Sequence, residues 1–176
     1  MRIARLVKRA KKGDKEALLQ LISEQQDDYY RLALSYMGNS HDAMDAMEEM
    51  IVSLYRHIPK LKKNESFYSW SKTILVNQCR KMLHKADRVV LLEDFETDEF
   101  HSEDVSLKRT EQAIDIQQML AVVNKHQREA IELKYFHDLD YKTIADITKV
   151  SVGTAKSRVF NGLNKMREAA RGEFND

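Results

Sequence analysis

The residues best suited to chemistry in this chain are cations and small polar groups that gather near its C-terminal end. Lys156, Ser157 and Arg158 follow one another directly. Lysine and arginine neutralise phosphates and release counterions, and short polar side chains hydrogen-bond base edges in the major groove. The candidate DNA-contacting residues of this segment are Thr154, Lys156, Ser157, Arg158, Phe160 and Asn161. The pattern predicts nucleic-acid binding rather than bond-making chemistry.

Residues that would support catalysis or metal binding are few. The sequence has no G-x-x-x-x-G-K-[ST] phosphate loop, and no two of its six histidines are spaced i, i+4 as in helical zinc sites. The one cysteine, Cys79, excludes an intramolecular disulfide and a multi-cysteine zinc site, and we expect it to be packed rather than nucleophilic. We therefore predict no enzyme activity, no cofactor and no metal site.

Charge is strongly segregated along the chain, although the formal total is only +1. Seven basic and one acidic side chain lie in residues 1–15, nine and two in 56–88, and seven and four in 141–176. Residues 16–55 have one basic and eight acidic side chains, and residues 89–112 have two and eight. Basic blocks attract phosphate backbones, whereas DNA repels acidic ones. The pattern indicates a nucleic-acid-binding protein with a second, basic partner, although any one block also fits a solvated helix face.

The composition predicts an all-α fold. The 176 residues include only five glycines and one proline, while 43% are hydrophobic and 32% charged; glycine and proline together make up ~12% of typical proteins. This length allows one domain or two small ones. No apolar run approaches the ~18 residues of a membrane span or the core of a signal peptide. We expect no membrane insertion and a cytoplasmic location.

Apolar periodicity predicts four helices in the first half of the chain. The first is short and basic and ends at Gly13; the second follows the N-cap Asp14 and ends at Gly38-Asn39. A third, capped by Ser40, has an acidic outer face and stops at Pro59. A lysine-rich loop then leads to a basic fourth helix from Ser66.

The second half contains a predicted linker and a predicted helix-turn-helix. Residues 88–109 lose all periodicity and are strongly acidic, so we predict a flexible linker there. Helical spacing resumes beyond residue 110. A short helix over 141–147, the turn 148–150 and a basic helix capped by Ser151, with Val152, Ala155 and Val159 inward, form a helix-turn-helix pattern.

Together these features are similar to the extracytoplasmic-function (ECF) sigma factors, the minimal two-domain form of the bacterial initiation factors. The motifs that carry the resemblance are GDKEALLQLI, YRLALSYMGNSHDAMDAMEEM, SFYSWSKTILVNQCRKMLHK and VSVGTAKSRVFNGLNKMRE. Their order and spacing cover nearly the whole chain. The resemblance implies a sigma-2 domain over 1–87, which docks on core polymerase and recognises and melts the minus-ten element. It implies a sigma-4 domain over 110–176, which recognises the minus-thirty-five element.

The resemblance also implies partners and roles. Core RNA polymerase would be bound through its β′ clamp helices and β flap, promoter DNA through both domains, and an anti-sigma factor would be a further partner. The β′ contacts would come from Asp42, Asp45, Glu48 and Glu49. The minus-ten contacts would come from Lys62, Lys63, Phe67, Tyr68, Trp70, Lys72, Asn77, Arg80, Lys81 and Lys85. Aromatic residues at this spacing also fit a helix core, and for Trp70 burial is the favoured alternative.

Some positions depart from the family pattern. Lys149 stands where the turn of the family usually has glycine. We therefore expect either that the Lys149 backbone adopts the left-handed conformation or that the turn has a different shape. Met44, Glu48 and Asn161 also differ from the usual residues, which bears on polymerase affinity and promoter preference.

The sequence is also compatible with two other functions. A one-component helix-turn-helix regulator with an N-terminal sensing or dimerisation domain would explain the last third of the chain, but not the basic helix over 66–88. An adaptor that mimics a sigma factor without touching DNA would not need the cluster Lys156–Arg158.

Overall fold

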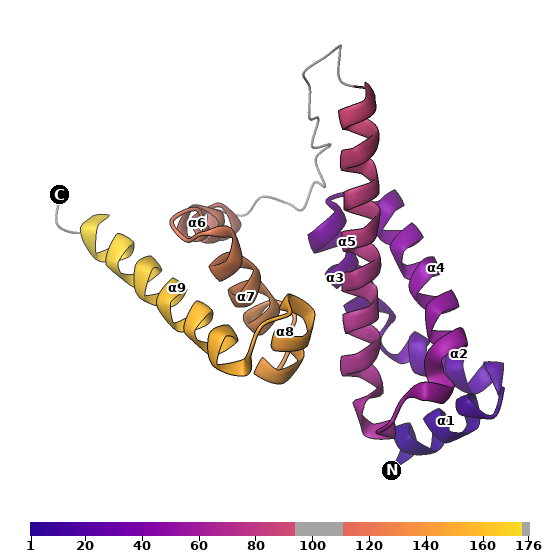
Figure 1. Ribbon diagram of the computed structural model, residues 1–176. Coiled ribbons are helices and arrows are strands. Elements are labelled where there is room, and N and C mark those ends of the chain that lie inside the picture. The colour runs from indigo at the N-terminus through magenta and orange to yellow at the C-terminus, as the bar shows by residue number, and fades with distance from the viewer. Residues whose placement is uncertain (94–110, 174–176) are drawn as a thin grey trace. The chain divides into compact units, whose positions relative to one another are not determined.

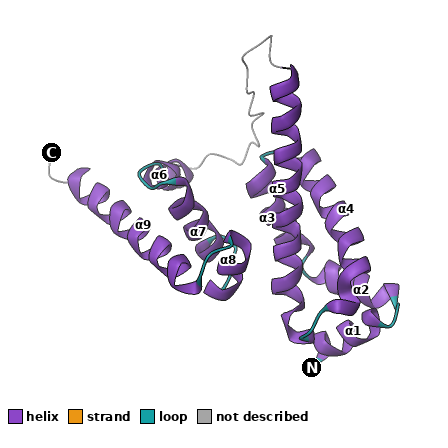
Figure 2. Cartoon of the chain, in the orientation of Figure 1, coloured by secondary structure: helices purple, strands orange, loops and turns teal. Residues whose placement is uncertain are grey.

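The computed structural model describes residues 1–93 and 111–173, and every regular element in these ranges is a helix (Figures 1 and 2). The chain divides into two compact units, Met1–Val105 and Ser106–Asp176. Residues 94–109 of the predicted linker lie outside the described residues. Residues 88–93, which were also assigned to the linker, continue the last helix of the first unit as far as Glu93.

The first unit contains five α-helices and two short 3₁₀ turns. Their bounds are α1 Arg2–Lys11, α2 Lys15–Glu24, α3 Gln26–Met37, α4 Ser40–His57, η1 Ile58–Lys60, η2 Asn64–Ser66 and α5 Phe67–Glu93. The core forms where α3, α4 and α5 pack on one another. Its largest fully buried side chains include Tyr29, Leu32, Met50 and Leu54, and burying each apolar one contributes about 1.5–3 kcal/mol.

Local capping sets most helix boundaries in this unit. Asp14 Oδ1 accepts the Ala17 amide at 3.1 Å, which with the nearby Arg9 lowers the pKa of the Asp14 carboxyl. Gly38, at φ +79°, ends α3 in the left-handed conformation that glycine adopts freely. Asn39 rather than the predicted Ser40 caps α4, because its Oδ1 accepts the Asp42 amide at 2.9 Å.

The predicted single helix between Asp14 and Gly38 is wrong: it is two helices, α2 and α3. The break falls at Gln25, whose φ of −123° and ψ of 27° leave the helical region. Neither glycine nor proline stands there, so the sequence carries no breaker signal. Leu21 and Ile22 before the break and Tyr29 after it are all buried, which explains why the apolar spacing looked continuous.

The second unit contains four helices: α6 Glu111–Leu120, α7 Lys125–Tyr135, α8 Tyr141–Thr148 and α9 Val152–Glu173. The predicted helix-turn-helix is confirmed as α8, a three-residue turn and α9 (Figure 1). Asp140 Oδ1 accepts the Thr143 amide at 2.7 Å to begin α8, and Ser151 Oγ accepts the Thr154 amide at 3.1 Å to begin α9. Lys149 takes the left-handed conformation, φ 59° and ψ 42°, so the turn keeps its shape without glycine.

The core of this unit forms between α7, α8 and α9. Ile131, Ile144 and Val159 are buried there. A Cβ atom added at Gly162 would lie 2.6 Å from Ile131 Cδ1, so this glycine lets α9 approach α7 closely. Val152 was predicted to face inward, but it is 40% exposed because it lies at the first turn of α9, before the buried stripe starts at Ala155.

Candidate nucleic-acid and protein interfaces

The N-terminal half of α9 presents the residues that the sequence proposed for DNA contact. Thr154, Lys156, Ser157, Phe160 and Asn161 are exposed and Arg158 is half-buried. Phe160 is 66% exposed, which is unusual for an aromatic side chain. Ser151 caps the N-terminus of α9, so the free backbone N–H groups of the first turn lie in the same region. These groups favour negative charge.

A polar hollow of about 450 Å³ lies between the start of α7 and the start of α9. Thr154, Ser157, Arg158 and Asn161 line one side of it. The spacing i, i+3, i+4, i+7 explains why these four residues share one face of α9. The start of α7 lines the other side with Asn124, His126 and Gln127. These three residues were missed, because only the packing of α7 on α9 brings them near.

Two lysines lie over the ring of Tyr141 at the start of α8. Lys134 Nζ is 4.6 Å and Lys156 Nζ is 5.7 Å from the ring centroid. Attraction between a cation and an aromatic face holds such side chains in place. Lys156 is therefore partly positioned before any phosphate arrives.

The exposed side of α5 carries a row of polar and basic groups. Asn77, Lys81 and Lys85 recur at i, i+4 and i+8 and are exposed. Arg80 lies beside them, half-buried, with its guanidinium 5.9 Å from the Tyr36 ring centroid. Lys62 and Lys63 are exposed in the segment before η2, and Lys72 is half-buried. The polar and basic groups proposed for the minus-ten element therefore reach the surface.

The aromatic residues at the start of α5 do not form the exposed platform that was proposed. Phe67 is fully buried and packs edge-on against Tyr68, with ring centroids 5.4 Å apart. Phe67 is therefore a core residue, and the prediction that it contacts DNA is wrong. Trp70 is half-buried, 6.1 Å from Phe67 between ring centroids, so burial accounts for part of its surface.

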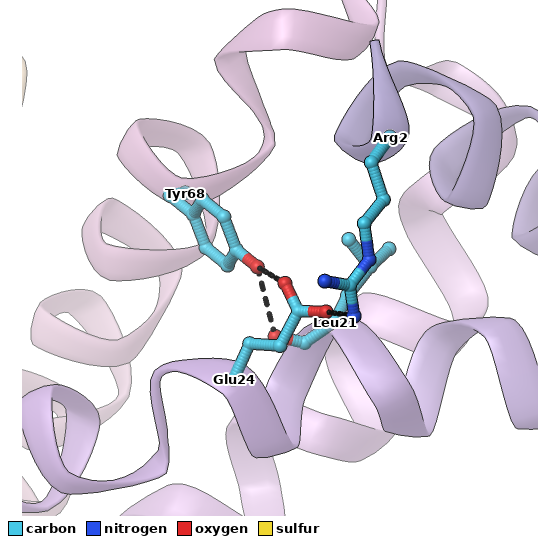
Figure 3. A network of polar contacts seen from close by, with 4 residues as sticks. All are labelled: Arg2, Leu21, Glu24 and Tyr68. Atoms are coloured by element: carbon cyan, nitrogen blue, oxygen red, sulfur yellow. Dashed lines mark hydrogen bonds and ion pairs between the residues drawn. The ribbon is translucent and has the colours of Figure 1, made fainter.

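Tyr68 ties α5 to α2 instead of standing free. Its hydroxyl lies 3.1 Å from Glu24 Oε2 and 3.2 Å from the carbonyl oxygen of Leu21, and Glu24 also pairs with Arg2 at 2.6 Å (Figure 3). Burial and the neighbouring Glu24 carboxylate raise the pKa of Tyr68 to about 12. Because its hydroxyl makes these contacts, Tyr68 contributes to the packing of α5 on α2. The proposed contact between Tyr68 and a base is therefore not supported.

The outer face of α4 combines acidic and apolar side chains. Glu48 and Glu49 are exposed. The side-chain Nδ2 of Asn39 donates to Asp42 Oδ2 at 2.8 Å, and Asp45 Oδ2 lies 3.6 Å from His41 Nε2. Three large apolar residues of α4 are also exposed, namely Met44, Val52 and Tyr55. Met44, Glu48, Val52 and Tyr55 follow at i, i+4, i+8 and i+11, which places them on one stripe. Apolar anchors among charges are typical of a protein-binding surface.

Comparison with known proteins connects these surfaces to one family. The model of Sigma-70 region 2 matches residues 21–89, and that of Sigma-70 region 4 matches residues 113–166. The RNA polymerase sigma factor SigV of Bacillus subtilis is 31% identical over 159 residues, which cover 89% of this chain and 93% of SigV. This chain belongs to the ECF sigma factors. Its function is that of an RNA polymerase sigma factor in transcription initiation.

Other relatives agree with this assignment. The ECF RNA polymerase sigma factor SigW of Bacillus subtilis is 27% identical over 184 residues, covering 97% of this sigma factor and 98% of SigW. The fold also matches the sigma factor RpoE solved in complex with the anti-sigma factor NepR from Bartonella quintana, with a TM-score of 0.64 and 24% identity. That match covers 86% of this chain and 95% of RpoE.

These similarities do not favour the one-component regulator. In the part of the chain that the structure describes, no helix is both long and apolar enough to cross a membrane.

Proposed function

We propose that this sigma factor recognises promoters through two separate DNA-binding surfaces and binds core polymerase through a third surface. The start of α9 would contact the duplex at the minus-thirty-five element. The segment before η2 and the exposed side of α5 would contact the minus-ten element. The acidic and apolar stripe of α4 would dock on the β′ clamp helices. The protein would act in the cytoplasm and leave the chemistry of transcription to the polymerase.

The observation that carries this proposal is the separation of exposed charge onto different helices. Glu48 and Glu49 are exposed on α4, whereas Lys81 and Lys85 are exposed on α5. An acidic surface is repelled by DNA and attracted to a basic protein surface, and a basic one binds phosphate. Because α4 also exposes Met44, Val52 and Tyr55, it offers the apolar anchors that a protein partner needs.

At the minus-ten element the proposal assigns binding to separated strands. Asn77 offers an amide to a base edge, and Lys62, Lys63, Lys81 and Lys85 offer cations to the backbone. Binding to exposed strand would offset the free energy of unpairing. Strand opening would then need no nucleotide hydrolysis by this chain.

At the minus-thirty-five element the proposal assigns binding to the major groove. Thr154, Ser157 and Asn161 line the hollow at the start of α9 and suit base-edge hydrogen bonds. Lys156 and Arg158 would neutralise phosphates, and Phe160 would make an apolar contact with a thymine methyl group.

Two protein partners follow from the same family assignment. In the second unit Ile116 and Met119 on α6, and Val122 just beyond it, are 40–45% exposed, which supports a protein contact there, and the β flap is the partner we propose. RpoE of Bartonella quintana was solved with an anti-sigma factor. We propose that an anti-sigma factor likewise binds this chain and competes with core polymerase.

The minus-thirty-five assignment is tested by paired charge removal on α9. The variant Lys156→Gln with Arg158→Gln should weaken binding to duplex DNA. It should also reduce the slope of log affinity against log salt by about 1.8, since each duplex phosphate contact contributes ~0.9. The control Lys165→Gln with Arg167→Gln removes the same charge from the same helix, farther along, and should leave the slope nearly unchanged. Equal effects of both variants would contradict the assignment.

A further inference from the structure

The N-terminal helix α1 carries the one basic block that the proposed function does not use. It lies before residue 21, where the match to Sigma-70 region 2 begins. Three of its apolar side chains, Leu6, Val7 and Ala10, are at most 6% exposed, and Ile3 and Ala4 are half-buried. Because this side is packed inside the first unit, α1 cannot insert an apolar face into a membrane. Its exposed side is cationic.

Three of the five cations of α1 have partners within the protein. Arg2 pairs with Glu24 and Arg9 with Asp14, each at 2.6 Å. Lys11 Nζ lies 2.5 Å from the carbonyl oxygen of Leu61 and 2.6 Å from Asn64 Oδ1. Arg5 and Lys8 of α1, and Lys12 at its C-cap, are exposed and make no ion pair within the described part of the chain. We call these three side chains the α1 basic face.

Lys11 places this face next to the segment proposed to contact the minus-ten element. Its two bonds hold Leu61 and Asn64 against α1, and the exposed Lys62 and Lys63 lie between those two residues. On an α-helix of 3.6 residues per turn, Lys8 lies about 60° and Lys12 about 100° around the axis from Lys11. The α1 basic face therefore borders the segment that carries Lys62 and Lys63.

We propose that the α1 basic face binds the DNA backbone that passes over Lys62 and Lys63, and so extends the minus-ten contact onto the N-terminal helix. Lys11 is then a positioning residue that joins the two sets of cations into one surface. This inference rests on the proposed function of the segment before η2.

The chemistry of the face fits phosphate better than an acidic protein. No large apolar side chain within α1 is strongly exposed, although Met1 just before the helix is, and protein interfaces need several such anchors. The nearby acids are few: Asp14 is paired with Arg9, while Glu16 and Glu65 are exposed. A surface of cations without apolar anchors is typical of sequence-independent backbone binding.

The test measures how salt weakens binding of the full chain to a fluorescein-labelled single-stranded DNA of mixed sequence. The variant Lys8→Gln with Lys12→Gln should reduce the slope of log affinity against log salt by about 1.4, since each single-strand phosphate contact contributes ~0.7. The matched control is Lys15→Gln with Arg56→Gln. It removes two exposed cations from α2 and α4, one of which lies over the Tyr55 ring, and should leave the slope nearly unchanged.

A third variant, Lys62→Gln with Lys63→Gln, separates this inference from the proposed function. If it lowers the slope and the α1 variant does not, the inference is overturned and the minus-ten assignment stands. If neither variant lowers the slope, both fail. An equal drop in the α1 variant and in the α2 and α4 control would show a net-charge effect and would also overturn the inference. Unchanged unfolding of each variant, followed by Trp70 fluorescence, verifies that the first unit is folded.

A separate pair of variants tests whether Lys11 positions the segment that carries Lys62 and Lys63. Lys11→Met should weaken single-stranded binding as much as the loss of Lys62 and Lys63, because the segment is released from α1. Lys11→Arg keeps two donors and should restore most of the affinity. Failure of Lys11→Arg to bind better than Lys11→Met, with both folded, would show that Lys11 does not position the segment.

Discussion

Lys149 shows how a single residue keeps the helix-turn-helix in shape at an energetic cost. Its backbone adopts the left-handed conformation, with φ 59°, and this conformation costs an L-residue about 1–2 kcal/mol. Lys149→Gly removes this strain but adds about 0.5–1 kcal/mol of backbone entropy cost. We therefore expect a net gain of about 0.5–1 kcal/mol in the stability of the second unit.

The measurement is urea unfolding by circular dichroism. Trp70, the one tryptophan, lies in the first unit, so its fluorescence should not change. Lys142→Gly, inside α8, is the control and should cost about 1 kcal/mol. A loss of stability in Lys149→Gly would mean that the lysine side chain makes contacts that outweigh the strain.

The N-cap Asp140 makes the stability of α8 depend on pH. Its carboxylate accepts the Thr143 amide, and this bond holds its pKa below the usual 3.8. A lowered pKa in the folded state means that the stabilisation is complete above about pH 4 and is lost as the pH falls through the folded pKa. Asp140→Ala should therefore cost about 1 kcal/mol near neutral pH.

In acid the gap between wild type and Asp140→Ala should narrow, as urea unfolding at a series of pH values would reveal. Asp146→Ala removes an exposed acid from the same helix without removing a cap. It should show little effect at any pH. A gap for Asp140→Ala that stayed constant into strong acid would disprove the capping role of the carboxylate.

Among the helices, α4 is the one that we propose binds protein rather than DNA. Glu48→Lys with Glu49→Lys places like charge against the basic polymerase surface that we propose, and such juxtaposition costs several kcal/mol. We expect core-polymerase affinity to fall about 100-fold or more, measured by co-elution with core enzyme. The control Glu16→Lys with Asp27→Lys reverses two exposed acids of α2 and α3 and should bind almost as wild type. Unchanged affinity of the α4 variant would remove the docking assignment.

The elements also show which features the sequence can reveal. Apolar spacing predicted the helices, and cap residues such as Asp14 and Ser151 predicted where two of them begin. The break at Gln25 has no local signal, because the tertiary packing of Leu21 and Tyr29 sets it. Phe67 was misassigned because an aromatic residue on a helix face has the same spacing whether it packs or binds a base. His126 was missed because only the packing of α7 on α9 brings it to the hollow.

The whole molecule consists of two compact helical units. In the function we propose, the first would bind polymerase and separated strands, and the second would bind duplex DNA through its helix-turn-helix. In the function we propose, neither unit would need a catalytic group, because sequence selection is a difference in binding free energy between promoter and other DNA. The order of motifs along the chain predicted two helical units, and the roles of these units remain a prediction. The predicted linker starts too early, because α5 continues to Glu93, and its C-terminal boundary remains a prediction.

Run-off transcription with purified core RNA polymerase and a library of genomic promoter fragments would show whether this chain directs initiation. Adding the full chain should produce discrete transcripts that core enzyme alone does not make, and the α4 variant with Glu48→Lys and Glu49→Lys should abolish them. The assignment as a sigma factor would be contradicted if the chain yielded no transcripts with core enzyme and instead bound a palindromic DNA site tightly as a dimer by itself.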